Sequence, residues 1–328
     1  MPPGRLYSYN RAMTARRLLA AMALTLALAA APQAASAGDF AQEVAAGLSL
    51  VGGDSAEDGA PPASLPSRVD LSSQWADGPR DQAPLQSCHD FAAVALLEAG
   101  YFRAAGRRLR LSEADLFARA TALRGARSVI IRENGLLRED LRFALAEGVL
   151  TGDGYRAFAD RFKSAPRLTP LRGARAGLER IFPEAATPEA SAERERVREE
   201  LSGLRVGGPG FLRFFGSAAR VILKGRGVRC RGRARRRDLL MTRLAGGQPV
   251  GIGLMLNGAS DPDLQARRDP LGGEHYLVVT GYDSTPDGVV FSLRNSWDHR
   301  PGSDSKLPEA DLCSLFGVSW ISAPGEPD

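Results

Sequence analysis

The chain has 328 residues, 44% of them hydrophobic and 25% charged, a composition that excludes collagen, coiled coils and wholesale disorder. Its 43 basic and 38 acidic residues leave a formal charge of +5, which raises the question of an anionic partner. Three cysteines are too few for a disulfide-dense scaffold. Any mechanism that uses imidazole must choose among His89, His275 and His299.

The N-terminus is typical of an export signal. Residues 1–37 carry four arginines and no acid, and the run 18–31 is apolar except for Thr25. That run is shorter than the roughly 20 residues needed to span a bilayer. The triplet Ala35-Ser36-Ala37 suits cleavage before Gly38. We therefore predict a signal peptide over 1–37, a periplasmic or secreted protein, and no stable membrane span after cleavage.

Helical patterns dominate the first half of the mature chain. Residues 38–66 are rich in Gly, Ala, Asp, Ser and Pro, which predicts a linker or short leader. Apolar residues then recur at helical spacing over 90–103. Ser112 and Asp115 resemble a capping box that opens a helix over 113–123, and a third helix over 138–147 ends at Gly148.

The segment 162–237 differs from its surroundings. It contains a charged helical pattern over 188–204, a glycine-rich stretch at 207–210, and eight basic residues without an acid over 224–237. That basic run lacks interleaved aromatic residues, so we expect a solvated loop and no nucleic-acid partner. Removing residues 1–37 leaves 39 basic against 38 acidic residues, which weakens the case for an anionic partner further.

Strand patterns dominate the C-terminal part. Three segments, 249–254, 276–282 and 289–294, are apolar, β-branched or aromatic and are bounded by Gly, Asp or Pro. Helices first and strands later predict an α+β fold.

Chemistry-bearing residues stand at the junctions of these elements. Cys88 lies where a loop becomes the first helix, so backbone N–H groups and the helix dipole are expected to lower its pKa. A small buried structural cysteine is the alternative for Cys88 taken alone. His275 begins one predicted strand and Asn295 ends the next, 20 positions on, so the paired strands bring amide and imidazole together. A Cys, a His and an orienting amide suit nucleophilic acyl transfer.

These residues resemble the papain family of cysteine peptidases. Gln82, six residues before Cys88, matches the family's oxyanion-hole glutamine, while His275, Asn295 and Trp297 match the remaining catalytic positions and the shielding tryptophan. Supporting similarities lie at 69–71, 111–116, 134–136, 147–149, 155 and 248–250.

The resemblance implies a two-lobed fold over 67–325, with a helical N-terminal lobe and an antiparallel β C-terminal lobe. The 187 positions from Cys88 to His275 are more than is usual for the family, which implies an insertion at about 162–237. The resemblance also implies an exported bacterial-type peptidase that cleaves a polypeptide through a Cys88 thiolate and a His275 imidazolium. In that mechanism Asn295 orients the imidazole and Gln82 stabilises the oxyanion. A catalytically inactive module that binds proteins or surfaces is the alternative, and a transferase using the same acyl-enzyme is a third. No zinc-ligand spacing, phosphate loop or dinucleotide fingerprint is present, so we expect no metal and no cofactor.

The chain departs from the family pattern at several positions. His89 follows the nucleophile where the family usually has Trp; we expect a helix-surface residue, the alternative being a titratable group beside the thiolate. His299 is expected in a loop. Cys230 and Cys313 are the remaining cysteine pair, and whether they bond stays open.

Overall fold

The computed structural model describes residues 65–82, 85, 87–127, 136–152, 154–164, 183–211, 233–256, 274–297 and 305–326. The predicted signal segment 1–37, Cys230 and His299 lie outside these residues. Among the described residues, no helix is both long enough and apolar enough to cross a membrane.

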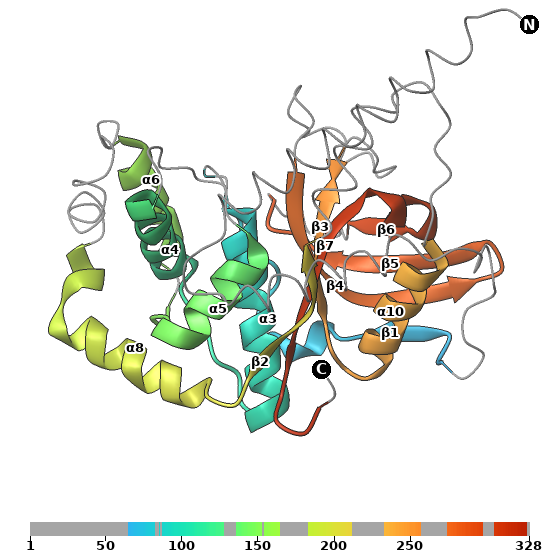
Figure 1. Cartoon of the computed structure of the whole chain (residues 1–328), viewed down its shortest axis with the longest axis horizontal. Coiled ribbons are helices and arrows are strands. Elements are labelled where there is room, and N and C mark those ends of the chain that lie inside the picture. The colour runs from blue at the N-terminus through green and yellow to red at the C-terminus, as the bar shows by residue number, and fades with distance from the viewer. Residues whose placement is uncertain are drawn as a thin grey trace, which may run out of the picture.

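The helices between residues 88 and 200 gather on one side of the molecule, whereas the later helix over 233–245 lies beside the sheet (Figure 1). Three predicted helices are confirmed. Ser112 caps the second of them, because the Asp115 N–H donates to the Ser112 hydroxyl at 3.2 Å. The reciprocal half of a capping box is not formed, since the Ser112 N–H donates to the Leu150 carbonyl at 2.8 Å. The charged pattern also forms a helix, which stops at Glu200 because Leu201 to Gly203 form a turn. The α-helices are α3 (Cys88–Ala105), α4 (Glu113–Arg127), α5 (Leu137–Glu147), α6 (Tyr155–Ser164), α8 (Pro188–Glu200) and α10 (Arg233–Ala245), with short 3-10 helices η1 (Ser72–Gln74), η2 (Pro183–Ala186) and η4 (Glu309–Ser314).

The other side of the molecule is one antiparallel sheet (Figure 1). Its strand order is β2-β7-β3-β4-β5-β6, with β1 paired to β4. The three predicted strands are confirmed, and four further strands complete the sheet. The strands are β1 (Arg68–Asp70), β2 (Arg205–Phe211), β3 (Val250–Met255), β4 (Glu274–Thr285), β5 (Gly288–Arg294), β6 (Lys306–Pro308) and β7 (Leu315–Ser322). Helices and sheet thus segregate as the α+β prediction requires.

Helix α3 is the central element of the core. Every residue from Cys88 to Tyr101 is buried, because other helices cover one side of α3 and the sheet covers the other. Glycines permit this close contact: a Cβ on Gly100 would lie 2.4 Å from Ile321 Cγ2, and one on Gly251 would lie 2.7 Å from Leu96 Cδ1. Helix α3 therefore packs directly against the sheet.

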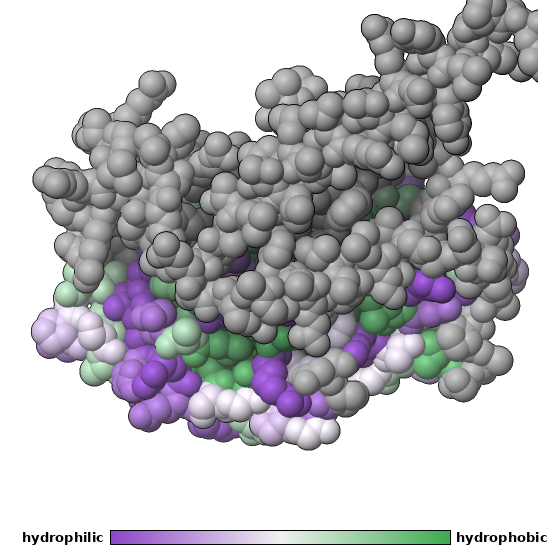
Figure 2. All heavy atoms as spheres, viewed as in Figure 1, coloured by the Kyte–Doolittle hydropathy of each residue, from purple (hydrophilic) through white to green (hydrophobic). Residues whose placement is uncertain are grey.

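Parts of the segment 162–237 belong to the body of the fold. Strand β2 pairs with β7 at the edge of the sheet. Helix α8 is anchored by Arg194, whose Nη2 lies 2.6 Å from Asp115 Oδ1 of α4. Its outer face is polar, and hydrophilic residues gather at the lower left of Figure 2, where α8 lies in Figure 1.

The expectation that residues 224–237 form a solvated loop is wrong for their described part. Residues from Arg233 onward are the first turns of α10, and Arg236 and Arg237 are buried. Arg236 Nη1 donates to the Leu312 carbonyl at 2.8 Å, and Arg237 Nη1 lies 3.2 Å from Glu309 Oε1. These contacts with η4 give the buried guanidinium groups the polar partners that burial requires. The sequence pattern of the basic segment 224–237 does not reveal these partners.

Candidate active site

Cys88 is the first residue of α3, and its side chain is 8% exposed. The backbone N–H of Tyr276, on β4, acts to lower the pKa of the Cys88 thiol, as do N–H groups at the start of the helix. Tyr276 is the neighbour of His275, so the helix start and the predicted histidine strand meet at this point.

The thiol does not have the low pKa expected from its place at a helix start. Burial raises the pKa of Cys88 to about 12, the N–H groups oppose this shift, and the negative charge of Asp90 adds to it. The prediction of a lowered pKa considered the helix dipole and omitted the loss of water around the sulfur. In this conformation Cys88 is a neutral thiol at neutral pH.

His275 and Asn295 form the predicted pair. Arg294 pairs with Val278 across β4 and β5, so the next residue, Asn295, leaves the sheet beside the start of β4. His275 Nε2 donates to Asn295 Oδ1 at 2.8 Å, and the Trp297 ring is stacked on the imidazole with centroids 3.6 Å apart. His275 is fully buried. Because the proton sits on Nε2, Nδ1 is the nitrogen able to accept one.

Gln82 lies beside the same strand end. Its backbone N–H donates to the Ser296 carbonyl at 2.7 Å, and the Ser296 hydroxyl donates to Gln82 Oε1 at 2.5 Å. One side-chain N–H donates to the Leu85 carbonyl at 3.1 Å. The Tyr155 hydroxyl of α6 donates to the Gln82 carbonyl at 2.7 Å. The loop before α3 is thus fixed to the residue that follows Asn295, and the four predicted site residues lie around one junction of loop, helix and sheet.

A buried charged cluster behind this junction was not predicted. Arg80 Nη2 lies 2.6 Å from Glu98 Oε1, and Arg80 Nε lies 2.7 Å from Glu113 Oε1. Burial raises the pKa of Glu113 to about 7, against the opposing charge of Arg80, and burial lowers the pKa of Arg294 to about 10. Of these side chains, Arg80, Glu113 and Arg294 line a small pocket together with Asn295 and Ser296. Glu98 carried the sequence signal, because it interrupts the apolar run of α3.

His89 is not the surface residue that we expected. It is 1% exposed, and its Nδ1 lies 2.6 Å from Asp140 Oδ2 and 3.1 Å from Asp90 Oδ2. The expectation failed because α5, distant in sequence, packs against this face of α3. Among the described residues, these three side chains form a group of the kind that can bind a metal ion, with their donor atoms within 4.8 Å of one another. Ligands bound to zinc at about 2.0–2.1 Å in a tetrahedron lie roughly 3.3 Å apart, so the 2.6 Å separation is that of a hydrogen bond.

Cys88 is a free thiol and Cys313 is disulfide-bonded. Cys230, the other cysteine of the chain, lies outside the described residues. The free thiol is the one at the start of α3.

Comparison with known proteins identifies the fold. No protein-family model and no curated protein matches the chain. Among solved structures, it is similar to xylellain, a cysteine protease from Xylella fastidiosa, with a TM-score of 0.50 and 17% identity over 81% of this chain and 91% of that one. Amb a 11, a ragweed pollen cysteine protease in its proform, has a TM-score of 0.44 at 15% identity, covering 80% of this chain and 66% of that one. Bromelain from Ananas comosus has a TM-score of 0.42 at 13% identity, and the match covers 79% of this chain and 100% of that one. The likeness to xylellain shows that the chain has the papain-like α+β fold.

Proposed function

We propose that the chain is a cysteine peptidase whose nucleophile is Cys88. The observation that carries the proposal is the His275–Asn295 hydrogen bond of 2.8 Å, shielded by the Trp297 ring, beside the helix that begins with a free thiol. This is the arrangement of nucleophile, base and orienting amide used in acyl transfer. The papain-like fold, shared with a known cysteine protease at the level of structure, supports a polypeptide substrate.

The chemistry follows from the tautomer and the thiol. Because Cys88 is neutral at rest, its proton must pass to His275 Nδ1 as the sulfur attacks the scissile carbonyl. The tetrahedral oxyanion then accepts hydrogen bonds from the Cys88 backbone N–H and from the second side-chain N–H of Gln82, since Leu85 engages only one. The imidazolium returns its proton to the leaving amine, and water hydrolyses the thioester.

The organisation of the whole chain is part of the proposal. We assign 1–37 as a cleaved export signal, 38–66 as a linker, and 67–325 as the peptidase domain, in which about 162–237 is an insertion. Strand β2 and the ion pair between Arg194 and Asp115 argue that this insertion is packed into the domain.

Active-site labelling tests the proposal. The purified chain is incubated with a peptidyl epoxide, and cleavage of a fluorogenic peptide library is followed in parallel. We expect modification at Cys88 and peptide cleavage, both lost in Cys88→Ala. His275→Ala should abolish cleavage, whereas His299→Ala, the matched histidine control, should retain it.

Three outcomes contradict the proposal. Peptide cleavage that survives Cys88→Ala would assign the activity to another group. Labelling of Cys88 no faster than that of an exposed free thiol, with no cleavage, would favour an inactive papain-like module. Aminolysis in place of hydrolysis when an amine acceptor is supplied would indicate the transferase.

A further inference from the structure

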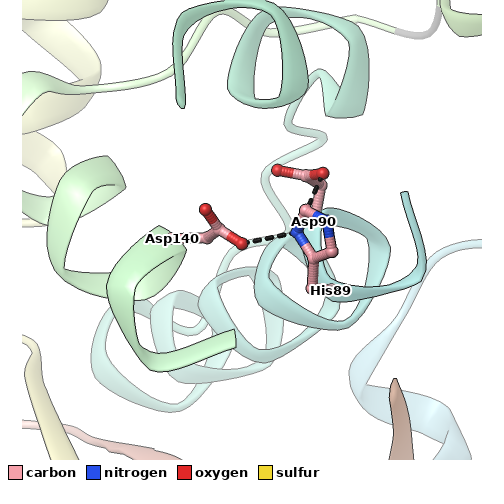
Figure 3. A group of neighbouring side chains, drawn as sticks. All are labelled: His89, Asp90 and Asp140. Carbon is pink, nitrogen blue, oxygen red and sulfur yellow. Dashed lines mark hydrogen bonds and ion pairs between the residues drawn. The ribbon is translucent and has the colours of Figure 1, made fainter. Parts of the chain in front are cut away.

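His89 joins the nucleophile helix to α5 at the residue next to Cys88. Figure 3 shows Asp140 reaching from α5 toward the imidazole of His89, with Asp90 of α3 approaching the same ring. Both carboxylates approach the same nitrogen, Nδ1, at 2.6 and 3.1 Å. All three residues are at most 1% exposed. Burial opposes a charge on the imidazole, whereas two carboxylates at one ring nitrogen favour the imidazolium.

The cluster matters to the thiol because of the charge on Asp90. That carboxylate is two residues from Cys88 and its field opposes ionisation of the sulfur. A positive charge on His89 faces the same carboxylate at 3.1 Å and opposes that field. Asp140 in turn favours the charge on His89.

We propose that His89 is an imidazolium held by Asp140 and Asp90, and that it acts as a positioning residue that makes the Cys88 thiolate attainable. This inference rests on the proposed peptidase function and adds to it a second histidine that touches no substrate. It replaces the prediction that His89 lies on the helix surface.

The titratable groups around Cys88 and His89 come from four elements. Helix α3 contributes Asp90, α5 contributes Asp140, and α6 contributes Tyr155, whose hydroxyl lies 2.5 Å from the hydroxyl of Ser87, the residue before Cys88. Strand β4 contributes His275 and Tyr276. The Tyr276 ring is perpendicular to the His89 ring, with centroids 6.3 Å apart.

The test is the pH dependence of Cys88 alkylation by iodoacetamide, with Cys88→Ala as the background. His89→Gln removes the positive charge, so we expect alkylation at pH 7 to slow about tenfold, equivalent to a rise of one unit in the thiol pKa. Asp140→Asn should act in the same direction. Asp90→Asn should act in the opposite direction, with faster alkylation. The double variant His89→Gln/Asp90→Asn should return toward the wild-type rate.

Controls separate this charge effect from a structural one. Asp140→Glu keeps the charge and should stay within about twofold of wild type, since one pKa unit corresponds to tenfold. Circular dichroism identifies the variants that fold. A structural role moves the alkylation rate of every folded variant in the same direction, whereas the charge effect has opposite signs for His89→Gln and Asp90→Asn.

Several results would overturn the inference. Folded His89→Gln and Asp90→Asn variants whose pH profiles match wild type, or shift in the same direction, would do so. Stoichiometric zinc bound by the wild type and lost in Asp140→Asn would also overturn it, by making the cluster a metal site. Alkylation needs no peptide, so failure of this inference and failure of the peptidase proposal are measured separately.

Discussion

The ion pair between Arg194 of α8 and Asp115 of α4 offers a sharp test of how segment 162–237 is attached. Arg194 Nη2 and Nε lie 2.6 and 3.1 Å from the Asp115 carboxylate, and Asp115 is completely buried. The substitution Arg194→Met keeps an apolar stem like that of arginine and removes the guanidinium charge. It leaves the carboxylate in the core with weaker partners.

The expected loss of stability follows from what remains around Asp115. Removing one partner of a buried pair costs about 3–5 kcal/mol. Asp115 still accepts the Leu150 N–H at 3.0 Å and keeps Arg119 at 3.6 Å, so we expect the lower end, about 3 kcal/mol. Arg196→Met is the matched control. Its partner is Glu200 on the same helix, and with the Arg196 side chain 59% exposed the expected cost is below about 0.5 kcal/mol.

Urea unfolding followed by circular dichroism measures both variants at pH 7. We expect a lower transition midpoint for Arg194→Met with an unchanged m-value, because the denatured state is unaffected. Equal free energies of unfolding for the two variants would refute the reasoning. That result would mean that α8 is not held to α4 by this pair.

Three further substitutions test the site and its support. Asn295→Ala removes the acceptor that orients the catalytic imidazole, so kcat/KM for a peptide should fall roughly 10- to 100-fold, as a buried hydrogen bond predicts; a change below threefold would argue against that role. Glu113 binds a proton more tightly in the folded state, so its contribution to stability is lost as pH rises from about 4.5 to about 7. This titration should lower the free energy of unfolding by about 3 kcal/mol between pH 4.5 and pH 8. Glu113→Gln should remove that pH dependence, measured by urea unfolding at the two pH values; an unchanged pH dependence would place the titration elsewhere. Gly148→Ala should lower the thermal midpoint more than Gly106→Ala. Both glycines have a positive φ, but only at Gly148 would a Cβ collide with a backbone atom, the Arg194 oxygen, at 2.0 Å; equal losses would show that φ alone decides.

Local patterns predicted the elements that have strong local signals. The helical spacing around α3, the capping residues Ser112 and Asp115, and the apolar runs of β3, β4 and β5 all correspond to observed elements. The patterns missed β1, β2, β6 and β7. Gly-rich β2, for example, becomes a strand only by pairing with β7 at the sheet edge. They also misplaced Arg236 and Arg237, because the partners that allow their burial lie on η4, far along the chain.

The sequence by itself determined the chemistry available to this protein. The order of helical and strand patterns was enough to predict the α+β fold class. The places of His275 and Asn295 at the ends of two neighbouring strands were enough to predict that imidazole and amide would meet. Tertiary structure alone decided the electrostatics. Burial of Cys88, the charge of Asp90 beside it, and the docking of Asp140 onto His89 depend on how α3, α5 and β4 pack together. Burial from solvent and contacts between distant segments cannot be read from a local sequence pattern. The pKa of the Cys88 thiol and the surroundings of His89 could therefore be known only from the folded structure.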